Sequence, residues 1–212
     1  TSLAAAQAGG PSALNYAFRM MYMPIGIFGV SIATAAIPDI AKHAAAREFD
    51  EMRKTLSWGI RLMLMLSVPA TVGLMVLSRP IVELIYQHGK FGPADTISVA
   101  AALLFYAPGI VGYSVVKLVS TSFYSLQDAR TPVIVSLITI GVNLALNIWL
   151  NSIMGFHGLA LGTAIAANVN ALLLLTLLSR KIDGVDSVRL LPSLAKILAP
   201  SAFMGVAAYY AE

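Results

Sequence analysis

Long apolar runs separated by short polar segments dominate the sequence. Six of these runs reach the roughly 20 residues that a helix needs to cross about 30 Å of hydrocarbon. No segment alternates apolar and polar residues with a period of two, which disfavours a transmembrane barrel. The pattern therefore predicts an all-α, polytopic membrane helix bundle in which residues 1–212 form one transmembrane domain. The six predicted spans lie at about residues 14–38, 56–77, 96–119, 132–153, 158–178 and 190–210.

The composition agrees with a membrane protein. Hydrophobic residues make up 58% of the chain and charged residues 11%, and the mean hydropathy is +0.80. Soluble domains carry roughly 25% charged residues, so a surface this poor in charge is suited to a bilayer. The net charge of +4 could indicate a nucleic-acid partner, but the basic residues sit in short loops and form no continuous patch, so no nucleic acid is expected. The lack of cysteine excludes disulfides, thiolate zinc sites and thiol catalysis.

The loop charges predict the orientation of the spans. Eleven basic residues fall on one side of the membrane, and only Arg79 and Lys90 fall on the other. Cytoplasmic loops are enriched in Lys and Arg, so the larger group is expected in the cytoplasm and both chain ends outside. The larger group consists of Lys42, Arg47, Arg53, Lys54, Arg61, Lys117, Arg130, Arg180, Lys181, Arg189 and Lys196.

The first ten residues, TSLAAAQAGG, contain neither an initiator Met nor a basic segment followed by an apolar one, so they are not a signal peptide. They are typical of the end of a preceding helix or loop. We therefore expect the chain to be a fragment of a longer membrane protein.

Four prolines interrupt the predicted spans: Pro24, Pro69, Pro108 and Pro200. Each removes a backbone donor and is expected to kink its helix. Transporters use broken helices to line cavities and to bend during alternating access, so these prolines favour a moving bundle. The alternative is that proline is simply commoner in membrane helices than in soluble ones.

Arg19, in the first predicted span, is a charge inside an apolar segment. An arginine at the centre of a membrane helix costs roughly 2.5–3.5 kcal/mol and usually faces a cavity or a partner. Its forked guanidinium is suited to phosphate, and especially to a diphosphate. The alternative is that Arg19, which lies near the outer end of the span, reaches the interface by snorkelling.

A polar cluster joins the fourth and fifth predicted spans. Asn143 and Asn147 are four residues apart and share a helix face, and Thr163 can approach that face from the next, antiparallel helix. Amide and hydroxyl oxygens, together with a backbone carbonyl, can coordinate Na⁺ or another hard cation. The alternative is that these side chains form hydrogen bonds between the helices.

The sequence carries no catalytic motif. It contains no nucleophile–base pair, P-loop, dinucleotide-binding fingerprint or cluster of metal-ligating residues. An enzyme is therefore not expected.

Several short motifs together resemble those of the MurJ (MviN) lipid II flippases. Residues 12–17 (SALNYA), followed by Arg19 and by residues 24–26 (PIG), resemble the start of the eighth helix of that family. Residues 87–91 (QHGKF) are similar to its short RGxF element, and residues 123–132 (FYSLQDARTP) to its FYAxxDTRTP loop. Residues 157–161 (HGLAL), followed by Asn170, complete the series. The motifs occur in the family's order over nearly the whole chain.

This resemblance implies helices eight to thirteen of a fourteen-helix transporter of the multidrug/oligosaccharidyl-lipid/polysaccharide exporter superfamily. It implies a lipid II flippase that translocates undecaprenyl-diphosphate-linked peptidoglycan precursor from the inner to the outer leaflet by alternating access. The implied location is the bacterial cytoplasmic (inner) membrane. The expected partners are lipid II, membrane lipids and the missing N-terminal half of the same protein.

The resemblance also implies roles for individual residues. Arg19 falls on an arginine of the family's central cavity, where it would bind the substrate. Asn143, Asn147 and Thr163 fall on positions of a Na⁺ site in the family, with the carbonyl of Leu159 as a further ligand. Na⁺ is therefore a candidate coupling ion.

Three positions depart from the family pattern. Phe18 stands where the family usually has Asp, and Tyr22 where some members have Glu. Asn147 stands where a carboxylate can occur, so the cation site is less negative here. These differences leave two alternatives open: an exporter of another polyprenyl-linked glycan or of a drug, and a non-transporting membrane scaffold.

Overall fold

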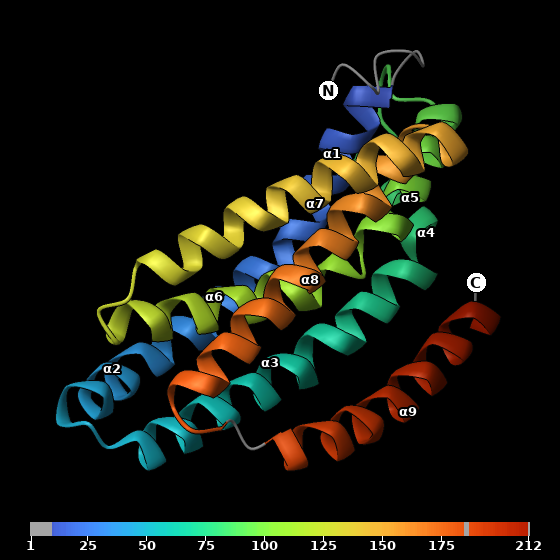
Figure 1. The fold of residues 1–212 in the computed structure, drawn as a ribbon. Helices are drawn as coiled ribbons and strands as arrows, with labels where there is room; N and C mark the ends of the chain where they lie inside the picture. The colour runs from blue at the N-terminus through green and yellow to red at the C-terminus, as the bar shows by residue number, and fades with distance from the viewer. Residues whose placement is uncertain (1–9, 185–186, 212) are drawn as a thin grey trace.

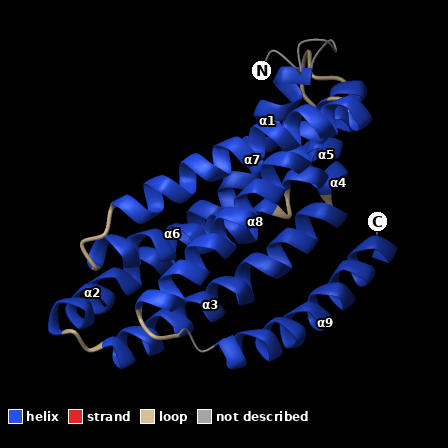
Figure 2. Ribbon diagram, in the orientation of Figure 1, coloured by secondary structure: helices blue, strands red, loops and turns tan. Residues whose placement is uncertain are grey.

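The described part of the chain is built from helices that run side by side along one axis, with no strand (Figures 1 and 2). The computed structural model describes residues 10–184 and 187–211. Short loops join the helices, as the polar segments between the apolar runs predict. The elements are α1 (Gly10–Pro24), the π-helical segment η2 (Ile25–Val30), α2 (Ser31–Ala46), α3 (Phe49–Val76), α4 (Ser78–Tyr86), α5 (Pro93–Tyr106), α6 (Gly109–Ser125), α7 (Arg130–Met154), α8 (Phe156–Lys181) and α9 (Ser187–Ala211).

The first five predicted spans coincide with helices long and apolar enough to cross a membrane. These are the continuous stretch Gly10–Ala46, α3, α7 and α8 in the described residues, together with α5 and α6 when that bent pair is taken as one span. The sixth predicted span falls in α9, where the side chains of residues 187–196 lie outside the described part and Ile197–Ala208 is a shorter apolar stretch. The all-α membrane bundle is thus confirmed, whereas a single domain over residues 1–212 stays a prediction.

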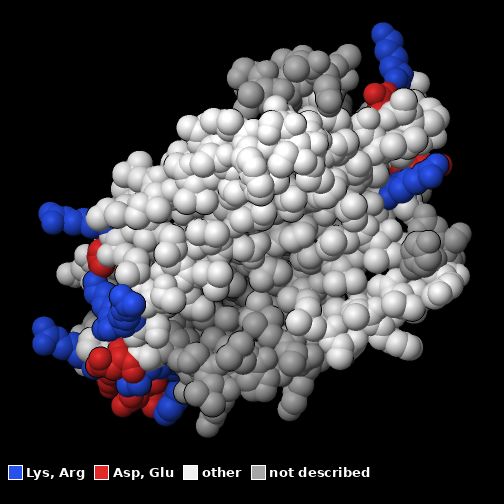
Figure 3. Space-filling view, turned by 45° about the vertical axis from the view of Figure 1, so that its right-hand side comes forward, with Lys and Arg blue, Asp and Glu red and all other residues white. Residues whose placement is uncertain are grey.

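Most charged side chains lie at the two ends of the bundle. The start of α1 and the end of α9 lie at one end, and α2, α6 and α8 finish at the other (Figure 1). On the face shown in Figure 3, charged side chains gather at the two ends, and the surface between them is almost free of charge. This arrangement agrees with the grouping of loops on which the predicted orientation rests. We refer below to the end with the start of α1 as the outer end.

Two of the four prolines singled out in the sequence coincide with an irregular helix. Pro24 directly precedes η2, although α1, η2 and α2 remain one continuous helix of 37 residues. At Pro108 the chain breaks, and α6 leaves α5 at an angle of 48°. Pro69 lies inside α3, and Pro200 inside α9, without ending either helix. A membrane helix tolerates proline where local adjustment satisfies the freed backbone groups, and a kink at Pro69 and at Pro200 stays a prediction.

The apolar core consists of two clusters that meet at the depth of these irregularities. The outer cluster joins α1, α4, α5, the first turn of α6 and the start of α8, with Met21, Leu103 and Ile110 fully buried. The inner cluster joins α2, α3, the rest of α6 and the end of α8, around Leu118 and Phe123. The two clusters meet where Gly29 of η2 packs against Ser114 of α6.

Helix α6 is held between its neighbours by close backbone approach. A Cβ at Gly112 would lie 2.6 Å from the carbonyl carbon of Ala167, so α6 and α8 touch main chain to main chain. On another side, Gly29 of η2 packs against Ser114. Small residues at membrane-helix contacts permit such packing. Helix α6, which carries part of the candidate site described next, is therefore firmly positioned.

Candidate functional site

Arg19 lies on the exposed face of α1. The buried residues of this helix, including Ala13, Ala17 and Met20, follow one helical stripe into the outer cluster, and Arg19 faces away from it. Nine residues separate Arg19 from Gly10, which places it about 14 Å along the axis from the start of the helix. Within the described residues its guanidinium has no hydrogen bond and no ion pair. The cation is thus available to a group outside the described chain.

Two tyrosines connect Arg19 with a second cation, Lys117 of α6. Tyr22 follows Arg19 by one turn, and its ring centroid lies 5.9 Å from that of Tyr113. Lys117 follows Tyr113 by four residues, so the two share a face of α6, and Lys117 is exposed. We call Arg19, Tyr22, Tyr113 and Lys117 the polar strip.

The sequence predicts Lys117 at the cytoplasmic end of the third span. The predicted span ended at residue 119, but α6 continues to Ser125 and leaves Lys117 in the middle of the helix. The i, i+4 spacing of Tyr113 and Lys117 was the signal in the sequence that could have identified it.

Phe18 and Tyr22, two of the departures from the family pattern, pack as aromatic rings beside Arg19. Their centroids are 4.8 Å apart, and Phe18 also lies 5.7 Å from Tyr106 in an edge-on contact. The rings extend the contacts between α1 and α5 across the outer cluster. Arg19 therefore has no carboxylate at either of these neighbouring positions to neutralise it.

The structure brings Asn143 and Asn147 of α7 together. Asn147 Nδ2 donates a hydrogen bond of 3.0 Å to Asn143 Oδ1. Asn147 Oδ1 is buried, lacks a hydrogen-bond partner among the described residues, and lies so close to Gly162 of α8 that a Cβ there would overlap it. Thr163, the next residue of α8, donates from Oγ1 to the carbonyl oxygen of Leu159 over 2.8 Å. The two amides thus lie beside the turn of α8 that carries Leu159 and Thr163.

This cluster fits a hard monovalent cation. A buried acceptor without a donor is costly, and a cation at Asn147 Oδ1 would satisfy it. The Thr163 hydroxyl uses its proton on Leu159, so its lone pairs remain available as ligands. The candidate ligands are neutral oxygens, and in the described ranges no group of three or more His, Cys, Asp and Glu could hold a metal. Neutral oxygens suit Na⁺ better than a divalent ion.

Asn168 has a structural role at the break in the α5–α6 pair. Its Nδ2 donates to the carbonyl oxygens of Pro108 (3.0 Å) and of Ala164 (2.8 Å). The first bond ties α8 to the corner where the chain bends. Asn170 Oδ1, by contrast, is buried with no partner in the described part of the chain.

At the inner end, Asp128 ties the loop between α6 and α7 to the last turn of α8. Its carboxylate accepts hydrogen bonds from Lys181 Nζ (2.5 Å), from Thr131 Oγ1 (2.8 Å) and from the Thr131 backbone N–H (3.1 Å). Asp128 belongs to the FYSLQDARTP segment, whose conformation these contacts hold. Hydrogen bonds from Lys181 and Thr131 keep the pKa of Asp128 well below its ordinary value.

Comparison with known proteins gives a consistent result. A family model described as "Lipid II flippase MurJ" matches residues 1–212. The probable lipid II flippase MurJ of Vibrio cholerae serotype O1 is 34% identical over 168 residues, which cover 79% of this chain and 32% of that protein. The probable lipid II flippase MurJ of Rhizobium meliloti is 32% identical over 212 residues, which cover 100% of this chain and 39% of that protein.

A solved structure is also similar. A chain described as "Lipid II flippase MurJ, inward closed conformation" aligns with a TM-score of 0.81 and 29% sequence identity, over 97% of this chain and 42% of that one. The chain thus spans about a third to two fifths of the length of the proteins that it matches.

Proposed function

This chain belongs to the MurJ lipid II flippase family, and from that membership we propose that it works as one lobe of a lipid II flippase. The proposed protein moves the undecaprenyl-diphosphate-linked peptidoglycan precursor from the inner to the outer leaflet of the bacterial cytoplasmic membrane. A second lobe of the same protein is part of the proposal, because the matched relatives are longer than this chain. Translocation makes and breaks no covalent bond, so the proposed role is that of a transporter and not of an enzyme.

The polar strip is the observation that supports this proposal. Two cations and two tyrosine hydroxyls on helices that otherwise present apolar side chains would be costly against lipid tails. They are tolerated where the strip borders a water-filled cavity closed by a second lobe. Arg19 lies about 14 Å along the helix axis from the first residue of α1.

In this proposal Arg19 binds the diphosphate of the lipid carrier. A guanidinium offers two parallel N–H donors to phosphate oxygens, and no carboxylate among the described residues pairs with Arg19 and compensates its charge. Lys117, further toward the inner end on the same strip, supplies a second positive charge along the path. An exporter of cationic drugs is disfavoured, because both charged groups of the strip would repel such a substrate.

We also propose that Na⁺ binds at Asn143, Asn147, Thr163 and the carbonyl of Leu159. The support is that Asn147 Oδ1 is buried without a hydrogen-bond partner in the described residues, and that Gly162, which has no Cβ, leaves space for this oxygen. When bound, the ion would supply the free energy of its gradient to the transport cycle. The residues would hold it through neutral oxygens only, so a carboxylate from the second lobe is expected to strengthen the binding.

The decisive test substitutes Arg19 in the complete protein, reconstituted in vesicles with a fluorescent lipid-linked substrate. Arg19→Ala should abolish flipping while leaving expression and unfolding temperature near normal. Arg19→Lys should restore only part of the rate, because an ammonium keeps the charge but loses the fork. Arg79→Ala, which removes an exposed cation of α4, is the matched control and should flip normally. A wild-type rate for Arg19→Lys would instead support snorkelling.

A further inference from the structure

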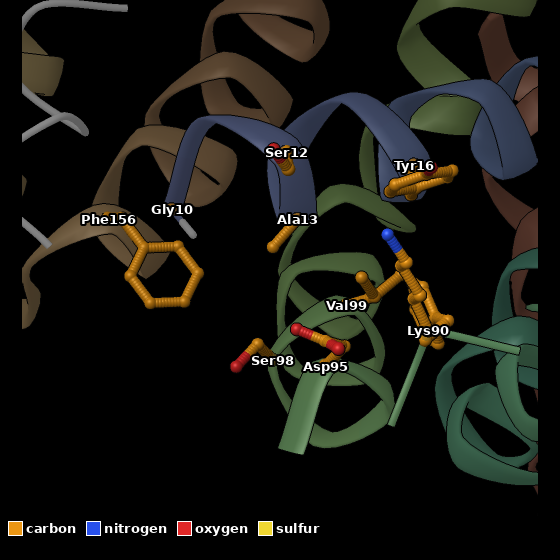
Figure 4. A pocket seen from close by; sticks show the side chains of 10 residues that line it. Gly10, Ser12, Ala13, Tyr16, Lys90, Asp95, Ser98, Val99 and Phe156 are labelled. Carbon is orange, nitrogen blue, oxygen red and sulfur yellow. The ribbon is translucent and has the colours of Figure 1, made fainter. Parts of the chain in front are cut away.

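A cavity at the outer end of the bundle shares a helix face with Arg19. Ser12, Tyr16 and Arg19 occupy positions i, i+4 and i+7 of α1, which lie above one another. Ser12 and Tyr16 also line a cavity of about 330 Å³ between the first turns of α1, α5 and α8 (Figure 4). Seven residues separate Ser12 from Arg19, so the cavity lies about 10 Å outward of the guanidinium along the helix axis. A single elongated ligand can therefore contact both places.

Aromatic rings form the apolar wall of this cavity. The Tyr16 ring packs edge-on against Tyr86 and Phe91, with centroid distances of 4.9 and 5.5 Å, which restrict its orientation. Phe156, the first residue of α8, lines the cavity from another side (Figure 4). Rings held in this way offer a rigid platform at little cost in side-chain entropy.

Polar groups of both charges line the same space. Lys90 reaches up toward Tyr16, while Asp95 and Ser98 lie together on the first turns of α5 (Figure 4). Among the described residues, neither Lys90 nor Asp95 forms an ion pair. Each charge therefore remains available to a ligand.

Hydrogen bonds at the start of α5 hold the Asp95 and Ser98 side chains of the cavity in place. Asp95 Oδ2 accepts the backbone N–H of Gly92 over 3.0 Å, and Ser98 Oγ donates to the carbonyl of Ala94 over 3.0 Å. A carboxylate has about four lone-pair positions, so Asp95 keeps capacity for further donors. These bonds fix Asp95 and Ser98 without exhausting them.

We propose that this outer cavity binds the saccharide part of the lipid-linked substrate, through a carboxylate carried on that headgroup, while the diphosphate lies at Arg19. This inference rests on the proposed function. Lys90 binds the carboxylate, Asp95 accepts hydroxyl or amide N–H groups, and a sugar ring packs against Tyr16. An acyl or prenyl tail would leave both charges unused, and a small inorganic anion would leave the aromatic wall unused.

The experiment measures binding of two ligands to the complete protein in detergent: the glycan-bearing lipid diphosphate, and the same polyprenyl diphosphate without sugars. Lys90→Gln should weaken binding of the glycan-bearing lipid about tenfold, the effect expected from losing one charge-assisted hydrogen bond. Binding of the bare diphosphate should not change. Arg79→Gln, which removes an exposed cation of α4 that does not line the cavity, should leave both affinities unchanged.

The outcomes separate the cavity from the proposed function. Equal loss of both ligands in Lys90→Gln, or no loss of either, would overturn the cavity assignment while the bare diphosphate still bound the wild type. An equal effect of Arg79→Gln would also overturn it, because a general surface charge would then explain the result. If the wild type bound neither lipid, the proposed function and the inference built on it would both fail. Selective loss of the glycan-bearing lipid supports the assignment.

Discussion

Asn147 holds its buried amide oxygen against the backbone of α8, and this one contact sets what the candidate cation site tolerates. The amide nitrogen is satisfied by Asn143, so the unsatisfied group is the oxygen alone. Gly162 is the residue that leaves space for that oxygen. A methyl group at this position would push the amide away from the turn that carries Thr163. The site is thus sensitive to a residue that contributes no ligand itself.

Gly162→Ala should therefore weaken Na⁺ binding. The added Cβ overlaps Asn147 Oδ1, so the amide must rotate away or α7 must shift, at a cost of about 1–3 kcal/mol in stability. The measurement is the rise in unfolding temperature when NaCl replaces choline chloride, which should be present in the wild type and absent in the variant. Gly141→Ala is the matched control, because nothing lies within 4 Å of a Cβ there. A wild-type response to Na⁺ in Gly162→Ala would count against this site.

At the scale of elements, the connections between helices carry much of the specificity. Asp128 joins the α6–α7 loop to the end of α8 through Lys181, and Asn168 joins α8 to the corner at Pro108. Both contacts link segments that are far apart in the sequence. These two polar side chains therefore add fixed points at the corners to the close helix packing.

Asp128→Asn should lower the unfolding temperature at neutral pH. The pKa of Asp128 is depressed in the folded protein, so the stability due to its charge is fully present above the ordinary value of 3.8 and is lost as the pH falls through the lowered pKa. The difference between variant and wild type should accordingly shrink as the pH is taken below about 3.8. Thermal unfolding followed from pH 7 to pH 3 measures this. Asp39→Asn, an exposed carboxylate without an ion pair in the described residues, should show no such trend. A constant difference across the range would contradict the assignment.

The elements differ in how far the sequence could predict them. Runs such as 132–153 and 158–178 are continuous and apolar, and they became α7 and α8 with small shifts at the ends. Helix α4 was missed because its nine residues, which include Arg79 and Pro80, are too few to form a membrane span. The π-helical turn at η2 leaves the apolar content unchanged, so no periodicity signals it.

The sequence predicts which site residues lie together when they belong to one helix, but it does not predict contacts between residues of different helices. Asn143 and Asn147 could be paired from their spacing alone, and the structure confirms their contact. The contact between Tyr113 and Tyr22 depends on how α6 packs against the first helix, which sequence spacing within one helix does not contain. The outer cavity likewise joins three helix starts and a loop.

For the whole molecule, the orientation in the membrane is the property on which the proposed function depends. The start of α1 and the end of α9 both lie toward the outer end, and the clusters of charge lie at the two ends of the bundle (Figures 1 and 3). Among the described residues, the helix ends and loops at the inner end carry most of this larger basic group, as the predicted orientation expects: Lys42, Arg47, Arg53, Lys54, Arg130, Arg180 and Lys181. The outer cavity and the cation cluster of the inner loops are thus expected on opposite sides of the bilayer.

Single-cysteine labelling tests this orientation, and the chain has no cysteine of its own to interfere. A membrane-impermeant maleimide added outside should label cysteines at Gly92 and Ser152 and should spare those at Glu48 and Asp183. Gly92 precedes α5 and Ser152 lies near the end of α7, both at the outer end, whereas Glu48 and Asp183 follow α2 and α8. Permeabilised cells, in which all four positions should react, provide the control. The reverse pattern would overturn the topology and the location of both candidate sites.

Because the core is divided into two clusters, we expect the lobe to deform unevenly when the bilayer strains it. The regular α-helical hydrogen-bond pattern is interrupted at η2 and at Pro108, in two helices that pack against each other, while α3 and α8 contact both clusters. We expect two cooperative units of different opening free energy, so amides of α1 and α5 should exchange with deuterium independently of those of α2 and α6. A thinner or thicker bilayer would then strain the lobe mainly where the two clusters meet. Flexure at that level lets one half tilt while the other keeps its packing.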